Sequence, residues 1–359
     1  MLSRFDLQGF RNYSGESFYP SAGLNLIVGD NGSGKTSLLE AIHVLATGRS
    51  FRNTRGSGLI REGVSETVLF GEVEGGDRVH RIGMRRKASG IQALRLDGTN
   101  AGSMGEVARV FPVQVFHPGT VDLVDGSPGT RRRYLDWGLF HVEPSFAGLH
   151  RQFRQALDQR NRLLKKDRPD PRELGVWDGQ IVAASDRIDQ LRRDWLERLT
   201  PVVNRLLEEL APLPPVSLTL ESGWPENRYL ARLFEEERDR DIARGFTGRG
   251  SHRADLRLTT DAGPVRDVFS RGQTKSLAYV LVLAQLELLV SGAGRSCLVL
   301  VDDLGSELDA EHRRGVLRMI ERLGQQTIFT ALAADDDLLA PLEQEIRVFH
   351  VEHGTLKTG

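Results

Sequence analysis

The stretch "GDNGSGKT", residues 29–36, decides the fold of this chain. It fits the pattern G-x-x-x-x-G-K-[ST], follows the apolar run "LNLIV" (24–28), and precedes apolar residues at helical spacing that stop at Gly48. A strand, a glycine-rich turn and a helix in this order bind phosphates through backbone N–H groups and the positive end of the helix. The sequence therefore predicts a site for a nucleoside triphosphate.

The glycines, the lysine and the threonine of this loop each have an expected part in binding the nucleotide. The glycines let the backbone approach the phosphates, the lysine neutralises the β- and γ-phosphates, and the threonine hydroxyl binds Mg²⁺. ATP and Mg²⁺ are therefore the predicted cofactors. The predicted ATP-binding residues here are Gly29, Asp30, Asn31, Gly32, Ser33, Gly34, Lys35, Thr36 and Ser37.

A second apolar run, "CLVLVDD" (297–303), ends in two carboxylates. A buried strand here places Asp302 at the carboxyl end of a sheet strand, where ligands of open α/β sheets lie. We expect Asp302 to hold Mg²⁺ through water, and Asp303 to be the catalytic residue that orients or deprotonates the attacking water. The alternative, that the two aspartates merely cap the next turn, is weaker for a pair that accompanies a phosphate-binding loop.

The two ends of the chain predict one α/β domain, and the middle predicts an insertion. Strand and helix patterns alternate in 1–120 and 256–359, as in a parallel sheet covered on both faces, with an antiparallel patch from "ETVLFGEVEGGDRVHRIGM" (66–84). "MLSRFDLQGF" (1–10) reads as an edge strand. Residues 121–255 form the predicted inserted, mainly helical domain.

The insertion contains two amphipathic patterns, over about 145–210, joined by the Pro-rich break "DRPDP" (167–171). Residues 145–168 carry seven Lys/Arg against two Asp, whereas 177–210 carry five Arg against seven acids. This opposite balance suits two antiparallel helices packed side by side. A projecting coiled-coil arm and a plain helical subdomain explain the pattern equally well.

The bulk composition excludes several classes of protein. The 359 residues are 39% hydrophobic and 27% charged, and no window approaches twenty consecutive apolar residues, so we expect no membrane span. The single cysteine excludes a disulfide framework, and together these features predict a cytoplasmic protein. The net charge of −1 argues against a chain that is basic all over, though not against a local basic patch.

The segment "SRGQ" shows that the loop is one part of a larger motif set. Ser270, Arg271, Gly272 and Gln273 precede a long apolar helix and resemble the S-x-G-Q signature of ABC-type ATPases. In that superfamily the signature grips the γ-phosphate held by the opposite subunit. "SELD" resembles the D-loop, with Ser306 and Asp309. Gln114 occupies the place of the Q-loop glutamine, a Mg²⁺ and water ligand, although a polar residue in a strand is an equal explanation for it.

The spacing and further segments narrow the resemblance. Lys35 and Ser270 are 235 residues apart, against roughly a hundred in transporter subunits, and the insertion lies between them. The whole chain resembles the RecF family of bacterial recombination mediators within the SMC-like ATPases. The residues that carry this are "FRNY" (10–13), "GRSFR" (48–52), "GSPGTRRRYLDWGLFH" (126–141), "ALDQRNRLLK" (156–165), "GSHRADL" (250–256), "FSRGQTKSLAYVLVLAQ" (269–285) and "LVDDLGSELD" (300–309). Two positions depart from the family pattern, Gly119 for a Glu and Ser251 for a Pro, and we expect Ser251 to alter only turn stiffness.

The resemblance implies an ATP-dependent homodimer with weak Mg²⁺-dependent ATPase activity that binds duplex and gapped DNA. With RecO and RecR, such a protein promotes RecA loading in recombinational repair and SOS induction. Arg11 and Asn12 are implied near ATP, and Arg131, Arg132 and Arg133 are the DNA-contacting candidates, unless they are only solvated or internally paired. The alternatives are an ABC transporter nucleotide-binding subunit and an SMC-like structural tether. His252 and Arg253 lie either near the nucleotide or in a capped turn.

Overall fold

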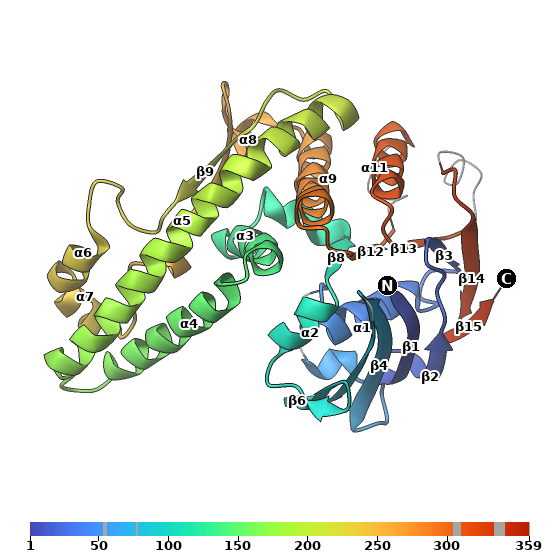
Figure 1. Cartoon of the computed structure of the whole chain (residues 1–359), viewed down its shortest axis with the longest axis horizontal. Coiled ribbons are helices and arrows are strands. Elements are labelled where there is room, and N and C mark those ends of the chain that lie inside the picture. The colour runs from blue at the N-terminus through green and yellow to red at the C-terminus, as the bar shows by residue number, and fades with distance from the viewer. Residues whose placement is uncertain (53–55, 77, 304–309, 334–341, 359) are drawn as a thin grey trace. The chain divides into compact units, whose positions relative to one another are not determined.

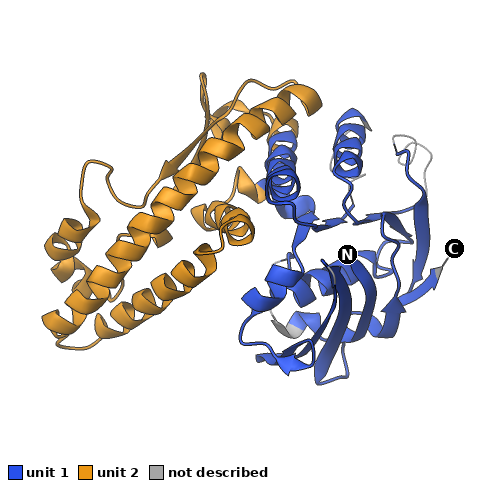
Figure 2. Ribbon diagram, viewed as in Figure 1, with its two compact units in different colours: residues 1–121, 275–359 blue, residues 122–274 orange. Residues whose placement is uncertain are grey.

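The computed structural model describes residues 1–52, 56–76, 78–303, 310–333 and 342–358. The chain forms two compact units: Met1–Val121 together with Lys275–Gly359, and the inserted Asp122–Thr274 (Figure 2). The insertion ends at Thr274, not at the predicted 255. The reason is that β10 (Asp255–Thr260) pairs with β9 (Ser217–Glu221), which holds it in the inserted unit.

Among the described residues, the first unit contains two six-stranded sheets (Figure 1). The antiparallel sheet has the order β2-β1-β4-β5-β6-β7: β1 (Leu2–Phe10), β2 (Tyr13–Phe18), β4 (Glu66–Gly75), β5 (Arg78–Lys87), β6 (Gly90–Leu96) and β7 (Thr99–Asn100). The second has the order β15-β14-β3-β13-β12-β8: β3 (Leu24–Val28), β8 (Val113–Phe116), β12 (Leu298–Val301), β13 (Thr327–Ala331), β14 (Ile346–Glu352) and β15 (Thr355–Thr358). Its neighbours are parallel except in the β14–β15 hairpin.

This arrangement confirms the α/β fold with a parallel-sheet core and an antiparallel subdomain, and it corrects one strand. β1 is not an edge strand, because β2 pairs with it on one side and β4 on the other. Sequence analysis does not find β2, whose "YSGESF" has an exposed middle and offers little apolar alternation.

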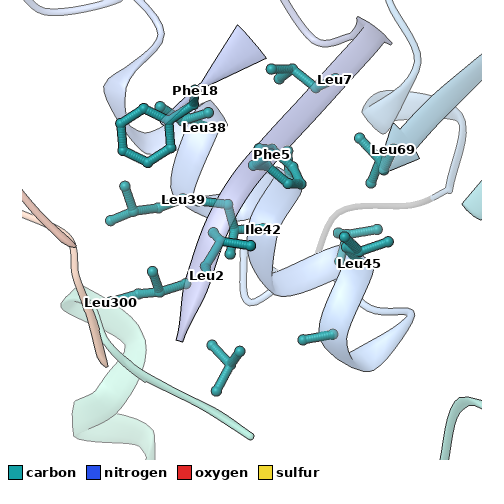
Figure 3. Close-up of a cluster of buried hydrophobic side chains, with 14 of the residues drawn as sticks. Leu2, Phe5, Leu7, Phe18, Leu38, Leu39, Ile42, Leu45, Leu69 and Leu300 are labelled. Carbon is teal, nitrogen blue, oxygen red and sulfur yellow. The ribbon is translucent and has the colours of Figure 1, made fainter. Parts of the chain in front are cut away.

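Helix α1 (Lys35–Thr47) is the core of the first unit. Its apolar residues pack against β1 on one side and against the parallel sheet on the other, as the labelled Leu2, Phe5 and Leu300 show (Figure 3). Because both of its faces are covered, eight of its residues are buried, including the charged Glu40. The helix ends at Gly48, whose left-handed φ of 72° suits glycine, as the sequence predicts.

The other helical segments of this unit are α2 (Met104–Val110), α11 (Ala310–Arg322), the short η1 (Gly56–Leu59) and η2 (Pro118–Leu123), and α9 (Arg271–Glu287), which continues as the π-helical η4 (Leu288–Gly292). Residues 271–292 are long and apolar enough to cross a membrane by length and composition. However, 67% of the most apolar window is buried in the structure, as in the core helix of a globular domain. Tyr279 of this helix stacks on Phe116 of β8 at 5.5 Å between ring centroids.

The inserted unit is mainly helical. Helices α4 (Phe146–Leu163) and α5 (Pro171–Leu210) form an antiparallel pair (Figure 1). α5 begins at Pro171, the last residue of the Pro-rich break, because Asp170 caps it and Leu174 joins the core. The remaining elements are α3 (Pro128–Val142), α6 (Leu230–Glu236), α7 (Arg238–Arg244), η3 (Ser251–Arg253), α8 (Val265–Val268) and β11 (Gly263–Pro264), which extends the β9–β10 sheet.

A buried ion cluster joins α4, α5 and α7. Arg160 is fully buried and donates to Asp178 at 2.5 Å, to Asp241 at 2.6 Å and to the Thr247 hydroxyl at 3.0 Å. Its guanidinium also lies 4.5 Å from the centre of the Phe234 ring. Because buried charges are costly unless paired, this cluster requires all its members.

Arg160→Ala should therefore destabilise the inserted unit by about 3–5 kcal/mol, since it leaves two buried carboxylates without their main partner. Arg162→Ala is the matched control: Arg162 is exposed, so its loss should cost less than about 0.5 kcal/mol. Urea unfolding followed by tryptophan fluorescence reads this unit alone, because all four tryptophans (Trp137, Trp177, Trp195 and Trp224) lie in it. Equal losses in the two variants would contradict the role of the cluster.

Candidate nucleotide-binding site

The loop between β3 and α1 has the backbone that the glycine pattern predicts. Gly29, Gly32 and Gly34 have φ values of 154°, 79° and 125°, which side chains other than hydrogen rarely allow. A Cβ on Gly29 would lie 2.3 Å from the Val351 carbonyl, so only glycine fits at that position.

Two carbonyl groups of the loop accept hydrogen bonds from residues outside the loop. Ser33 O accepts from Asn12 Nδ2 at 2.8 Å and from Gly354 N at 2.8 Å. Gly34 O accepts from the Tyr13 hydroxyl at 3.0 Å. Asn12 was predicted near ATP, and in this structure it holds the loop. Tyr13 and Gly354 are not found by sequence analysis, because they lie near opposite ends of the chain and outside any phosphate-binding pattern.

These bonds orient the phosphate-facing side of the loop. In a trans peptide the carbonyl and the following N–H point in opposite directions. Holding Ser33 O and Gly34 O on one side therefore turns the N–H groups of Gly34 and Lys35 to the other side. The result is a set of aimed donors at a helix N-terminus, which is the arrangement that binds phosphate.

Lys35 lies over the same loop. Its ammonium donates to Gly29 O at 2.5 Å and to Asp30 O at 2.9 Å. Desolvation lowers the pKa of Lys35 below its ordinary value, while the nearby Asp303, Asp302 and Asp30 oppose that shift. A partly desolvated cation at this position is suited to pair with phosphate charge.

Thr36 and Asp302 meet as predicted, although they are far apart in sequence. The Thr36 hydroxyl donates to Asp302 Oδ1 at 2.8 Å, and the Thr330 hydroxyl donates to the same oxygen at 3.1 Å. Burial raises the pKa of Asp302, and the two hydroxyl bonds oppose that effect. A hydroxyl beside a desolvated carboxylate is a donor set that fits Mg²⁺, a cation that prefers oxygen ligands.

Asp303 follows Asp302 with an exposed side chain and a left-handed φ of 52°. Its N–H donates to the Thr330 hydroxyl at 2.9 Å. Left-handed backbone is uncommon outside glycine, and Asp and Asn tolerate it best. The bond to Thr330 holds the Asp303 backbone in this conformation, and the backbone conformation sets the direction in which the carboxylate leaves the chain. Among the described residues, no group of three or more His, Cys, Asp or Glu side chains gathers as a metal site of its own.

The structure does not bring Gln114 to this site. In the parallel pairing of β8 with β12, Gln114 lies opposite Val299, three positions before Asp302. At about 3.3 Å per residue this separates the two levels by about 10 Å. The residue level with Asp302 is His117, whose pKa burial lowers to about 4.

Arg11, the residue before Asn12, bonds to helix α1. Its guanidinium makes two bonds to the buried Glu40 carboxylate, at 2.9 and 2.8 Å, and Ser50 of the "GRSFR" segment bonds the same carboxylate. Arg11 therefore ties β1 to the middle of α1. Its predicted contact with ATP stays a prediction.

The signature segment forms the start of α9. Ser270 N donates to Gln273 Oε1 at 2.8 Å and Gln273 N donates to Ser270 Oγ at 3.4 Å, a reciprocal capping box. Gly272, between them, has no atom within 4 Å of where a Cβ would lie. Nothing in its own chain therefore requires glycine there. The predicted D-loop residues Ser306 and Asp309 lie outside the described residues.

All three candidate DNA-contacting arginines make internal bonds. Arg131 forms a two-bond ion pair with Asp255, at 2.8 and 3.0 Å, and Arg132 donates to Ala254 O at 2.5 Å. Arg133 donates to the Thr130 hydroxyl at 3.1 Å, and Arg192, not Arg133, binds the nearby Asp136. The run of three arginines is therefore explained by bonds within the inserted unit.

The segment "GSHRAD" belongs to the same internal network. His252 and Arg253 both bond the Thr247 carbonyl, at 3.1 and 3.3 Å, which favours the capped turn over a place near the nucleotide. Ser251 N donates to the Ser185 hydroxyl at 3.3 Å, a bond that proline cannot make. This departure from the family pattern therefore changes a contact as well as stiffness. At Gly119 a Cβ would lie 2.6 Å from the His117 ring.

Comparisons with known proteins agree with this geometry. The model of the RecF/RecN/SMC N terminal domain matches residues 1–357. A DNA replication and repair protein RecF from Pseudomonas putida is 38% identical over 361 residues, covering 99% of this chain and 97% of the relative. One from Pseudomonas fluorescens is 39% identical with the same coverage.

The chain belongs to the RecF family. A solved structure of the recombination mediator protein RecF with ATP in the RecFOR pathway is similar over the whole chain, with a TM-score of 0.89 and 26% identity, and 97% of that structure is covered. Family membership makes this an SMC-like ATPase of the ATP-binding type, as the resemblance of the whole chain predicts.

Tyr13→Phe tests the anchoring of the loop. Removing one hydroxyl bond to Gly34 O should weaken ATP binding about fivefold, since a hydrogen bond contributes about 1 kcal/mol. Tyr19→Phe makes the same chemical change at an exposed ring and should leave affinity unchanged. Calorimetric titration with ATP measures both, and unchanged affinity in Tyr13→Phe would contradict the anchoring.

Proposed function

We propose that this protein is a cytoplasmic, DNA-binding ATPase in which Mg-ATP joins two copies of the chain. The observation that carries the proposal is the signature segment. Its Ser270 and Gln273 cap α9, and Gly272 between them leaves open space at the helix N-terminus. An open, capped helix N-terminus suits the approach of phosphate from another molecule.

A signature that binds the partner's ATP makes the nucleotide part of the interface. Two-fold symmetry then gives two identical composite sites, each with Lys35 from one chain and Gly272 from the other. ATP binding favours the joined state because only that state offers both sets of contacts. Hydrolysis removes the γ-phosphate and with it the link.

The residues beside the loop fit a bound Mg²⁺. Thr36 and Asp302 would hold it, Asp302 through water, and it would supply charge neutralisation at the β- and γ-phosphates. Asp303 would accept a proton from the attacking water or orient it. Many ABC-type ATPases have Glu at the position of Asp303. Because the Asp side chain is one methylene shorter, it would hold the attacking water less well, so hydrolysis would be slow and would act as a timer.

The DNA and partner assignments rest on the relatives. Curated relatives bear the name of a DNA replication and repair protein, and a structural relative is a recombination mediator in the RecFOR pathway. We therefore propose binding to duplex and gapped DNA, and action with RecO and RecR in loading RecA and in SOS induction. The 235-residue separation of Lys35 and Ser270 argues against a transporter subunit, and the 40-residue α5 is short for a structural tether.

Mixing two defective variants tests the composite site. Lys35→Met removes the phosphate-binding cation, and Gly272→Leu adds a bulky side chain at the signature, where a Cβ meets no atom of its own chain within 4 Å. Each variant alone should lose ATP-dependent dimerisation, at least tenfold in dissociation constant. A mixture should recover dimers, because one of its two sites pairs the intact loop of one chain with the intact signature of the other.

Analytical ultracentrifugation with Mg-ATP measures the recovery, and ADP is the control. Mixtures as monomeric as the separate variants would show that the site is not shared between chains. A wild-type protein that stays monomeric with ATP would overturn the proposed switch as a whole.

Asp303 gives a test of the timer. Asp303→Asn keeps the left-handed backbone and should slow single-turnover hydrolysis about 100-fold while ATP-dependent dimers persist. Asp303→Glu extends the carboxylate by one methylene and should hydrolyse several times faster than wild type. Quenched-flow measurement of ATP cleavage reads both, and a slower Asp303→Glu variant would contradict the explanation.

A further inference from the structure

The segment 145–168, which contains α4 and the four residues up to Arg168 that follow its C-terminal turn, exposes an unusual concentration of positive charge. Of the seven Lys/Arg residues in 145–168, only Arg160 is buried. The other six are exposed: Arg151, Arg154, Arg162, Lys165, Lys166 and Arg168. The acids of the same segment are Asp158 and Asp167.

Packing between α4 and α5 does not use this charge. The sequence indicates that the basic helix faces the acidic one, yet the contact between them contains one buried pair, Arg160 with Asp178. Of the six exposed cations, Lys166 pairs with Glu173 at 3.3 Å. Within the described part of the chain, Arg151, Arg154 and Arg162 have no acidic side chain within 4 Å.

The helix pair is therefore electrically asymmetric. The exposed charges of α5 include six acids, Glu173, Asp186, Asp194, Glu197, Glu208 and Glu209, against four arginines, Arg172, Arg187, Arg198 and Arg205. Unpaired like charges on one helix face repel one another, and each like pair one turn apart costs a few tenths of a kcal/mol. The exposed Asp158 lies one turn from both Arg154 and Arg162 and offsets part of this charge, but three arginines against one aspartate leave the face with a net positive charge. A net positive face that makes no ion pair among the residues that the structure describes points to a partner of opposite charge.

The spacing suits a nucleic-acid backbone. Arg151, Arg154 and Arg162 span about 16 Å at 1.5 Å per residue, on one side of the helix. Each strand of duplex DNA carries a phosphate every ~3.4 Å along its axis, so long arginine side chains over this length reach two or three phosphates of one backbone. Arginine is also the side chain best matched to phosphate oxygens.

We infer that the exposed face of α4, defined by Arg151, Arg154 and Arg162, is a surface for the phosphate backbone of duplex DNA, in place of Arg131 and Arg132. The inference rests on the proposed DNA binding and locates it on the inserted unit. Contacts of this kind position the duplex without reading its sequence. The acidic face of α5 disfavours DNA on that side of the pair.

The test compares two triple variants of the full chain with Mg-ATP. Arg151→Ala/Arg154→Ala/Arg162→Ala removes the α4 stripe. Arg187→Ala/Arg198→Ala/Arg205→Ala removes the same charge from the exposed side of α5 and serves as the matched control. Fluorescence anisotropy with a labelled 30-base-pair duplex, over a range of salt concentrations, gives the slope of log affinity against log salt.

The α4 variant should lose about 2–3 units of this slope, and the α5 control should keep the wild-type value within one unit. Circular dichroism and ATP-dependent dimerisation confirm that each variant folds. If wild type and both variants bind DNA with the same salt slope, the α4 assignment is wrong while the proposed DNA binding stands. The positive face of α4 would then fit an acidic protein partner instead. If wild type binds no DNA with ATP, the proposed function fails and the inference with it.

Discussion

The constraint on which the site depends is that hydrogen bonds must hold two carbonyl groups of the phosphate-binding loop on the side opposite to its phosphate-facing amides. Tyr13 bonds Gly34 O, and Asn12 and Gly354 bond Ser33 O, so the amide groups between them face outward. These anchors come from the turn after β1 and from the C-terminal hairpin. Residues from both ends of the sequence, on either side of the inserted unit, therefore hold the loop.

The sequence is most informative where one short segment determines the local structure. The loop, its strand and helix, and the carboxylates after β12 follow from such segments, and Thr36 and Asp302 meet at 2.8 Å although 266 positions separate them. Tyr13 and Gly354 escape sequence analysis because their contribution is a backbone contact made across the fold. Gln114 is misjudged because the register of β8 against β12, which sets its level, has no local signature.

The arginines show a second limit of sequence reasoning. Arg131 and Arg132 belong to the densest basic run, yet both are partly buried, and they bond Asp255 and the Ala254 carbonyl within the inserted unit. The basic residues of α4 are dispersed along the sequence and gather only on the folded helix. Exposure, not density along the chain, separates structural arginines from those available to a polyanion.

The central claim is that one ATP is held by two chains, and cross-linking tests it most directly. Asn31→Cys on the exposed loop of one chain and Val268→Cys, at an exposed position two residues before Ser270, on a second, differently tagged chain should join through a short bismaleimide with Mg-ATP and not with ADP. The native thiol of Cys297 should stay silent, because burial raises its pKa to about 12. Cross-links between the two tagged chains that require ATP are the predicted result. Absence of such products, or equal yields without nucleotide, would contradict the shared site.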